Sequence, residues 1–515
     1  MILLLSRFKY RSVSEIPVEI PWNHSELMIH ESLLIHDYAT PSFHSSANSL
    51  LRKLRHSNLH IGISFSPSLP HNKVSVLKKM AKEYSFDCFL LNDESSVDGV
   101  NEITLSWGDI GGEILFLVPS DKKDAFGQLS SFGWIIVVFD VEGAGACESS
   151  GVVCISKLEE LPMIICASIR KATGDEVVTV GYIMKTSREE DFAKRGAFPM
   201  NPTPNGLMFL PLTFELPLLS QLQLVDIVLH KATDEIISVD LSGSSESSNR
   251  ITFSTGMQEL QRYMEHHSDC FAIDPLDKIY PVLDRLEIQQ ILLGLDALNK
   301  ESCRAIRGPH FLKVNGFNDP DLAQNLSEAK LSLPSIVKPQ VACGVADAHS
   351  MAITFRVEDF KDLNVPLPAI VQEYVDHSST IFKIYVLGEQ VFYAVKKSIP
   401  NANVLTKSSE LNELKPLLFD SLKSLPTSTG HSTVKPDWYF DDSYYNYELA
   451  YKSTSSHALS HLFCCGGENQ IQDGTGDHVI VDVNYLPSFK EVPYDIAVPA
   501  FWNAIRHKFE SRKRK

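Results

Sequence analysis

An aspartate and an asparagine near the C-terminus share one face of a segment that alternates like a β-strand. In the run 478–489, His-Val-Ile-Val-Asp-Val-Asn-Tyr-Leu-Pro-Ser-Phe, Asp482 and Asn484 point away from the valines. The glycine-rich segment Asp473–Asp477 before it predicts a tight turn, and therefore a hairpin. Oxygen ligands on a rigid hairpin suit magnesium, which takes few protein ligands beside nucleotide phosphates. The alternative is a strand end whose polar side chains face water.

Two lysines lie in segments that otherwise read as buried strands. Lys338 follows Ile336 in strand alternation, and Lys383 lies within the apolar run 381–395. A lysine in such a position either extends its ammonium group to water or meets an anion, because an unpaired buried charge is costly. The chain has no Gly-x-x-x-x-Gly-Lys sequence, so a nucleotide-binding loop of the P-loop type is not expected.

A chain of 515 residues is too long to fold around one ordinary hydrophobic core, so more than one domain must position these residues. Residues 1–172 contain continuous apolar runs, among them 113–118 and 134–139, which are typical of a sheet covered by helices on both faces. The segment 172–176 reads as a boundary. We expect an N-terminal α/β extension over 1–172, a Rossmann-like subdomain over 177–275, and further subdomains over 276–515. A serine-rich surface loop is expected at 242–249.

Composition limits the class of partner. The formal net charge is −17, which argues against a general nucleic-acid binder and requires any polyanionic ligand to be held by a local basic cluster. The nine cysteines lack metal-ligand spacing and fit a reduced compartment. No apolar run approaches about 20 residues, so no membrane partner is expected. A cytoplasmic location follows, with nuclear import as an alternative because the tail 512–515 is Arg-Lys-Arg-Lys. A solvated charged terminus is the favoured interpretation of that tail.

Seven motifs occur in the order seen in one kinase family. They are Val-Gly-Tyr at 180–182, the run 225–234, Asp-Pro-Leu-Asp at 274–277, the run 337–344 followed by His-Ser-Met at 349–351, and the runs 371–377, 382–388 and 481–487. Over residues 177 to about 505 the chain resembles the inositol 1,3,4-trisphosphate 5/6-kinases, also called inositol-tetrakisphosphate 1-kinases. It resembles most the plant branch that carries a long N-terminal extension.

The resemblance implies an α/β protein in which an ATP-grasp kinase core follows a Rossmann-like or haloacid-dehalogenase-like (HAD-like) N-terminal domain. It implies ATP and a pair of magnesium ions as cofactors, inositol phosphates as substrates, and a monomer. Catalytic roles would belong to Lys338, Asp482 and Asn484. ATP would be bound by Lys338, Gln372, Glu373, Tyr374, Val375 and Ser398. Inositol phosphate would be bound by Arg188, Lys231, His349, Lys383, Asn484 and Ser488, and metal by Asp482 and Asn484.

The chain also departs from the family pattern. Tyr280 stands where many relatives have an arginine, Cys343 where many have a histidine, and Ser488 where glycine is usual. Relatives place a Phe-Gly-x-Asp strand, with a second metal ligand, where residues 462–470 read Leu-Phe-Cys-Cys-Gly-Gly-Glu-Asn-Gln. Glu468 is the nearest carboxylate and is not expected to substitute. Residues 444–462 lack the amphipathic helix expected there. An incomplete metal site with weakened activity is therefore predicted.

Two other functions remain open at this stage. A catalytically impaired protein that still binds inositol phosphates would fit the altered 440–470 segment. Phosphatase chemistry in the N-terminal domain is the other, because the segment Phe139–Gly143 resembles the strand-end motif of HAD-like phosphatases, although those enzymes have a second aspartate where Glu142 stands. A structural or regulatory domain is the simpler interpretation of that region.

Overall fold

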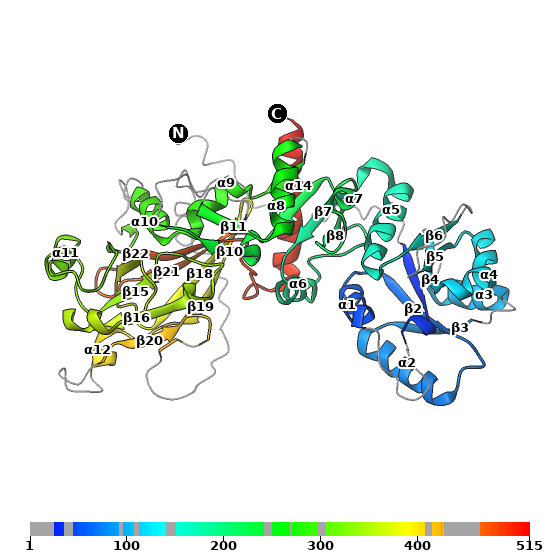
Figure 1. The fold of residues 1–515 in the computed structure, drawn as a ribbon, viewed down its shortest axis with the longest axis horizontal. Helices are drawn as coiled ribbons and strands as arrows, with labels where there is room; N and C mark the ends of the chain where they lie inside the picture. The colour runs from blue at the N-terminus through cyan, green and yellow to red at the C-terminus, as the bar shows by residue number, and fades with distance from the viewer. Residues whose placement is uncertain are drawn as a thin grey trace. The chain divides into compact units, whose positions relative to one another are not determined.

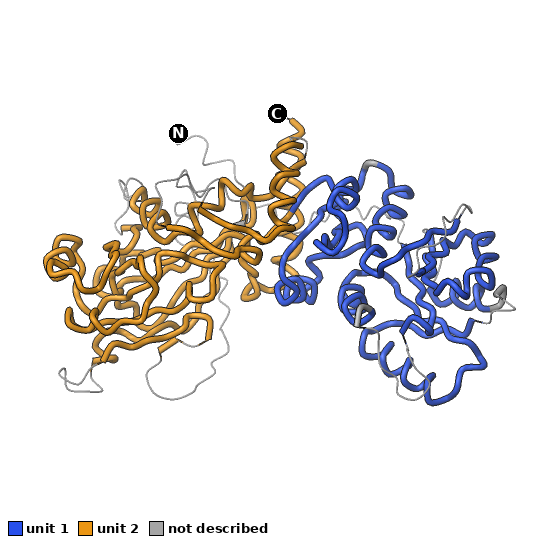
Figure 2. Tube along the Cα trace, in the orientation of Figure 1, with its two compact units in different colours: residues 1–228 blue, residues 229–515 orange. Residues whose placement is uncertain are grey.

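A computed structural model describes residues 25–34, 45–91, 96–107, 113–140, 151–241, 250–267, 270–295, 305–406, 415–423, 425–426 and 464–514. The chain divides into two compact units, Met1–Val228 and Leu229–Lys515 (Figure 2). The boundary falls within β9 (Ile227–His230). The expected serine-rich loop 242–249 and the altered segment 444–462 lie outside the described residues.

The first unit contains a six-stranded parallel sheet with the order β3-β2-β1-β4-β5-β6 (Figure 1). Its strands are β1 (Glu26–His30), β2 (His60–Phe65), β3 (Asp87–Leu90), β4 (Ile114–Pro119), β5 (Ile135–Phe139) and β6 (Val152–Ile155). The helices between and after them are α1 (Ser45–Leu54), α2 (His71–Tyr84), α3 (Ser96–Trp107), α4 (Lys123–Phe126) and α5 (Leu161–Thr173). Five of the six residues of β4 are buried, which explains the continuous apolar run and confirms the expected α/β class.

The order of this sheet reverses at β1, since β2 and β4 lie on opposite sides of it. Ligands of such doubly wound sheets bind outside the carboxyl ends of the strands at this reversal. In the described part of the phosphatase-like segment, Phe139 ends β5 and Asp140 follows it, and residues 141–150 are outside the described residues. The strand at the reversal, β1, ends in His30. Phe139 and Asp140 therefore do not lie at the strand reversal, the position at which this sheet type binds ligands.

The first unit continues through β7 (Val178–Ile183), α6 (Thr186–Ala193), β8 (Leu207–Pro211) and α7 (Leu218–Leu222), and β7 and β8 pair in parallel.

Cys154, on β6, is disulfide-bonded, so the expectation of reduced thiols is wrong for this residue. Within the described ranges, no helix is both long and apolar enough to cross a membrane.

The second unit contains two five-stranded sheets. The first sheet has the order β13-β22-β21-β18-β19 and comprises β13 (Ile306–Arg307), β18 (Thr380–Leu387), β19 (Gln390–Lys397), β21 (Cys464–Ile471) and β22 (His478–Tyr485). The second has the order β14-β17-β15-β16-β20 and comprises β14 (Phe311–Val314), β15 (Ser335–Pro339), β16 (Ser350–Thr354), β17 (Ala369–Glu373) and β20 (Leu417–Asp420). A two-stranded sheet pairs β10 (Ile236–Val239) with β11 (Ile251–Phe253).

Helices and one short strand complete the second unit. They are α8 (Thr255–His266), β12 (Phe271–Ile273), α9 (Leu276–Ile279), α10 (Arg285–Leu293), α11 (Leu322–Glu328), α12 (Ala402–Thr406) and α14 (Tyr494–Lys513). The buried core beneath the second sheet joins strand residues such as Val337 and Val371 to Leu322 and Leu326 of α11. The two sheets are linked directly by the residues between β17 and β18, so each sheet can contribute side chains to one site.

Candidate functional site

The predicted hairpin is confirmed. Strands β21 and β22 pair antiparallel through the turn 472–477, in which Gln472 N donates to Asp477 O over 2.8 Å. Val479, Val481 and Val483 are buried, Asp482 is half-buried and Asn484 is exposed. The alternation read from the sequence therefore assigns the correct face to each of these side chains.

Three charged side chains form a row across β18, β21 and β22. Lys383 lies opposite Glu468, and Glu468 lies opposite Asp482 in the strand register. Lys383 Nζ is 3.1 Å from Glu468 Oε1, and Asn484 Nδ2 donates to Asp482 Oδ2 over 3.0 Å. Residues directly opposite each other in an antiparallel pair have Cβ atoms about 4.5–5.5 Å apart. The segment 464–471 is thus a paired strand, and it brings a second carboxylate beside Asp482.

This register places Glu468 opposite Asp482, in the strand where relatives carry the second aspartate. A glutamate at this position presents the same carboxylate group as an aspartate, with one more methylene of reach. Its carboxylate is in part neutralised by Lys383, and both side chains are about one-third exposed, 33% for Glu468 and 30% for Lys383. Of the two alternatives for Lys383, the structure supports contact with an anion.

Lys338 lies on β15 of the second sheet and is only 9% exposed. Its Nζ donates to the carbonyl oxygen of Val481, on β22 of the first sheet, over 3.4 Å. Burial lowers the pKa of Lys338 to about 8, although the carboxylate of Asp482 opposes the shift. The ammonium group therefore does not extend to bulk water, and it lies beside the strand that carries Asp482 and Asn484.

Lys231 follows β9 and is 8% exposed. Its Nζ donates to the carbonyl oxygen of Tyr485 over 2.5 Å and lies 3.8 Å from the centre of the Tyr485 ring. Both contacts place the Lys231 ammonium at the end of β22. Lys231 therefore contacts the last residue of β22, the neighbour of Asn484 in sequence.

His349 begins the approach to β16, and its Nδ1 lies 3.1 Å from Ser421 Oγ. Burial lowers the pKa of His349, and the nearby guanidinium of Arg285 lowers it further. The imidazole is therefore neutral near pH 7 and would act as a hydrogen-bonding group.

The other predicted site residues lie on separate elements. Ser488 follows β22 and is half-buried, and Ser398 N donates to Ser379 O over 2.8 Å. Arg188 lies on α6 of the first unit.

The segment expected to meet adenine, Gln372–Val375, joins the two sheets. Arg307 holds its Glu373 through two nitrogens, at 2.7 Å and 2.9 Å from the carboxylate oxygens. These hydrogen bonds lower the pKa of Glu373 although burial acts in the opposite direction. The Tyr374 hydroxyl donates to the carbonyl oxygen of Pro400. Val375 packs in one apolar cluster with Val479 and Val481 of β22. The linking segment is therefore fixed to the strand that carries the predicted metal ligands.

Sequence reasoning missed two buried charged residues near this site. Glu491, 6% exposed, accepts from the Tyr385 hydroxyl over 2.5 Å and from Lys396 Nζ over 3.0 Å, and these contacts lower its pKa despite burial. Arg285 is 6% exposed at the start of α10. The only signal for Arg285 in the sequence is its position after Asp284, a residue type that begins helices.

The donor set near Asp482 fits magnesium. Among the described residues no three histidine, cysteine or carboxylate side chains gather as a complete metal site. However, Glu468, Asp482 and Asn484 offer oxygen atoms on neighbouring strands, and magnesium bound with a nucleotide takes its other ligands from phosphates and water. The side chains present therefore suit an ion that arrives with ATP.

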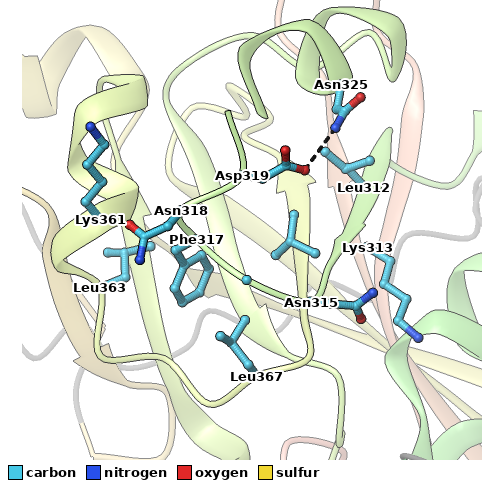
Figure 3. A pocket seen from close by; sticks show the side chains of 12 residues that line it. Leu312, Lys313, Asn315, Phe317, Asn318, Asp319, Asn325, Lys361, Leu363 and Leu367 are labelled. Carbon is cyan, nitrogen blue, oxygen red and sulfur yellow. Dashed lines mark hydrogen bonds between the residues drawn. The ribbon is translucent and has the colours of Figure 1, made fainter. Parts of the chain in front are cut away.

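A surface cavity of about 530 Å³ lies at the edge of the second sheet, beside β14 (Figure 3). Lys313, Asn315, Phe317 and Lys361 are among its lining residues, and Asn325 Nδ2 donates to the Asp319 carboxylate over 3.3 Å. No residue that we predict to bind nucleotide, substrate or metal lines this cavity. The cavity is therefore distinct from the candidate site.

Two family models match the chain. Residues 25–171 match the model described as "ITPK4, N-terminal HAD-like domain". Residues 300–433 match the model described as "Inositol 1,3,4-trisphosphate 5/6-kinase ATP-grasp domain".

Relatives extend these matches over most of the chain. The chain is 47% identical over 470 residues to inositol-tetrakisphosphate 1-kinase 6 of Oryza sativa subsp. japonica, covering 91% of this chain and 84% of the relative. It is 27% identical over 270 residues to inositol-tetrakisphosphate 1-kinase of Danio rerio, covering 52% of this chain and 64% of the relative. Among solved structures, D-alanine–D-alanine ligase of Bacillus anthracis is similar with a TM-score of 0.38 and 12% identity, over 66% of this chain and 99% of the ligase.

Proposed function

We infer that this chain, which belongs to the inositol-tetrakisphosphate 1-kinase family, transfers the γ-phosphate of ATP to a hydroxyl group of an inositol polyphosphate. It is an ATP-dependent kinase with an ATP-grasp core and an N-terminal HAD-like domain. The observation that carries the inference at the site is the meeting of Lys338, from one sheet, with the strand of Asp482 and Asn484, from the other. A buried cation next to a strand that carries carboxylate and amide oxygens supports this inference, because phosphate transfer depends on positioned charges.

The proposed roles follow from position and charge. Lys338 would contact the phosphates of ATP, and Gln372–Val375 would hold adenine through backbone groups, with Ser398 near the nucleotide. Inositol phosphate would be held by Arg188, Lys231, His349, Lys383, Asn484 and Ser488. In phosphate transfer the protein has little covalent chemistry to perform, so positioning and electrostatic stabilisation suffice without a nucleophilic side chain.

Magnesium would be held by Asp482 and Asn484, with Glu468 as an additional carboxylate. When bound, the metal would neutralise charge that develops on the transferred phosphate group. The chain's own residues would fix the two substrates: Lys338 would orient the nucleotide phosphates, and Lys383 and His349 would orient a phosphate group of the inositol. We further propose a pair of ions, as the family resemblance implies.

The test is chromatography of inositol phosphates after the full chain is incubated with magnesium and ATP. We expect a product with one more phosphate group than the inositol phosphate supplied. Inositol 1,3,4-trisphosphate and an inositol tetrakisphosphate should be supplied separately, because the chain's preference between them is open. If ATP stays intact and neither substrate gains a phosphate while both still bind, the chain is an impaired binding protein and the proposal is wrong.

Glu468 should contribute to transfer through its carboxylate. We expect Glu468→Gln to lower kcat about tenfold or more, because it removes one negatively charged oxygen ligand from the pair opposite Asp482. Glu468→Asp restores the carboxylate found in relatives and should retain activity within a few-fold. Steady-state kinetics over a range of magnesium concentrations would test this. Full activity of Glu468→Gln would show that Glu468 is not a ligand.

Lys383 should act on the inositol phosphate rather than on ATP. We expect Lys383→Met to raise the KM for inositol phosphate roughly tenfold and the KM for ATP much less, because a charge-assisted hydrogen bond contributes roughly 1.5–3 kcal/mol. Lys361→Met, a change at an exposed lysine beside the surface cavity, is the matched control and should change neither KM. Equal increases in both KM values for Lys383→Met would contradict the assignment.

The remaining expectations concern organisation. We propose that residues 1–172, 177–275 and 276–515 are the functional subdivisions, that the chain is a monomer, and that it works in the cytoplasm, with nuclear import as the alternative. The match of the HAD-like family model to residues 25–171 supports the first boundary. Light scattering of the full chain would test the monomer, and a molar mass of about twice 57.6 kDa would contradict it.

A further inference from the structure

Arg285 is a buried cation whose side chain, within the described part of the chain, bonds only to backbone oxygens. Its Nη1 donates to the carbonyl oxygens of Pro339, Val341 and Ala348 over 2.6, 2.8 and 3.1 Å, and its Nη2 donates to that of Ala342 over 3.3 Å. Among the residues that the structure describes, no carboxylate forms an ion pair with Arg285. Burying a charge without an opposite charge is costly, so an anion that arrives from outside would be favoured near it.

All four acceptors belong to one stretch of chain. We call residues 340–349, which join β15 to β16, the connection loop. Pro339 precedes the loop directly, and Val341, Ala342 and Ala348 lie near its two ends. A single planar guanidinium group therefore ties the start of the connection loop to its end.

Backbone contacts fix the same loop to the start of α10. Arg285 N donates to Gln340 O over 2.8 Å, and Ala342 N donates to Leu283 O over 2.9 Å. Gln340 Nε2 donates to the carboxylate of Asp284 over 2.8 Å. The residues on both sides of the Arg285 side chain thus hold the loop in register with the helix.

The conformation of the connection loop is also fixed in its middle. Gly344 has a φ of +88°, and a Cβ atom at this position would lie 2.6 Å from Cδ1 of Ile236. A residue with a side chain would be strained there and would clash with β10. The loop therefore approaches its neighbours closely at its ends and at its centre.

The two predicted phosphate-binding residues of this region flank the connection loop. Lys338 precedes it by two positions, and His349 is its last residue. The positive charge of Arg285 acts on both side chains, since it lowers the pKa of Lys338 and that of His349. Burial lowers the pKa of Arg285 itself, while Asp482 acts in the opposite direction. Arg285 thus lies among the groups expected to surround the transferred phosphate.

We propose that Arg285 is a positioning residue for phosphate binding: its buried guanidinium fixes the connection loop and thereby places Lys338 at the phosphate groups of ATP and His349 at the inositol phosphate. This inference rests on the proposed kinase function and adds to it a residue that need not touch either substrate. It predicts that loss of Arg285 weakens the binding of phosphate groups while leaving the binding of adenine intact, because Gln372–Val375 lies outside the connection loop.

The test compares the dissociation constants of adenosine and ADP, measured by titration calorimetry on the full chain in the presence of magnesium. The dissociation constant of adenosine divided by that of ADP reports how much the phosphate groups add to affinity. We expect Arg285→Met to lower this ratio at least tenfold, which corresponds to about 1.4 kcal/mol, and to leave the constant for adenosine within about twofold. A lower ratio with unchanged adenosine binding would not follow from general destabilisation.

Arg285→Lys separates charge from geometry and serves also if the methionine variant fails to fold. Lysine keeps the positive charge but cannot make the forked set of bonds to four carbonyl oxygens, so we expect the ratio to fall for this variant as well. Complete rescue by lysine would mean that charge alone matters and would overturn the positioning role.

Arg307→Met is the matched control, because Arg307 holds Glu373 beside the adenine segment. This variant should weaken the binding of adenosine and of ADP by the same factor, so the ratio of the two dissociation constants should not change. The proposal is wrong if Arg285→Met behaves in the same way as Arg307→Met, or if it changes neither constant. A wild-type chain that binds adenosine and ADP equally would instead contradict the nucleotide site itself, and this inference with it.

Discussion

Replacing Asp482 with alanine should lower kcat about a thousandfold while leaving the fold intact. The half-buried carboxylate of Asp482 lies on a central hairpin strand, opposite Glu468 and next to Asn484 in space. A bound metal contributes several kcal/mol of charge stabilisation during phosphate transfer, and about 4 kcal/mol corresponds to a factor of roughly a thousand. Initial rates of product formation at saturating ATP and inositol phosphate would measure the loss.

A matched control distinguishes this effect from a general loss of negative charge. Asp495, in the first turn of α14, is exposed, and Asp495→Ala should leave kcat within about twofold. Thermal unfolding of the Asp482→Ala chain should occur near the temperature of the unaltered chain, because the side chain has little packing to lose. A reduction of less than tenfold in kcat would mean that Asp482 is not the principal metal ligand.

Lys338→Met should weaken ADP binding about tenfold to a hundredfold. Methionine fills a similar volume but removes the ammonium group, and a hydrogen bond to a charged group contributes roughly 1.5–3 kcal/mol. Folding should not suffer, because the change removes a buried cation whose only hydrogen bond to the described residues is to Val481 O. Calorimetric titration would measure the affinity. Unchanged ADP binding would remove Lys338 from the nucleotide site.

The pKa of Lys338 adds a second test of the same assignment. Because burial lowers this pKa to about 8, the free chain loses the cation as pH rises through that value. Phosphate groups would favour the protonated form, so ADP binding should take up a proton above pH 8, and ADP affinity should fall as pH increases. Near pH 6 no proton should be taken up by Lys338. Titrations in buffers with different ionisation enthalpies would show both effects, and both should vanish in Lys338→Met.

The hairpin shows why local sequence could predict part of this site. The turn Asp473–Asp477 and the alternation of valines are properties of neighbouring residues, and they fixed the faces of Asp482 and Asn484 correctly. The apolar runs 113–118 and 134–139 likewise predicted a covered sheet in an α/β domain, and both runs form strands of the parallel sheet of the first unit. Where a signal repeats within a few residues, the sequence specifies the structure directly.

Contacts between distant segments could not be read in the same way. The partner of Glu468 depends on the register of three strands, and a shift by one residue would have turned its carboxylate to the other face. The burial of Lys338 depends on a strand more than a hundred residues away. Arg285 bonds to carbonyl groups, which every residue possesses, so no residue type near it marks the contact. These features follow from tertiary packing rather than from local pattern.

We propose that the chain moves a phosphate group from ATP to an inositol polyphosphate at the site formed by Lys338 and Asp482. The most direct measurement uses ATP labelled at the γ-phosphate and follows the label into inositol phosphates, with Asp482→Ala measured in parallel. We predict label in a more highly phosphorylated inositol with the unaltered chain and its near absence with Asp482→Ala. Label that appears only as free phosphate, or equal transfer by both chains, would contradict the claim.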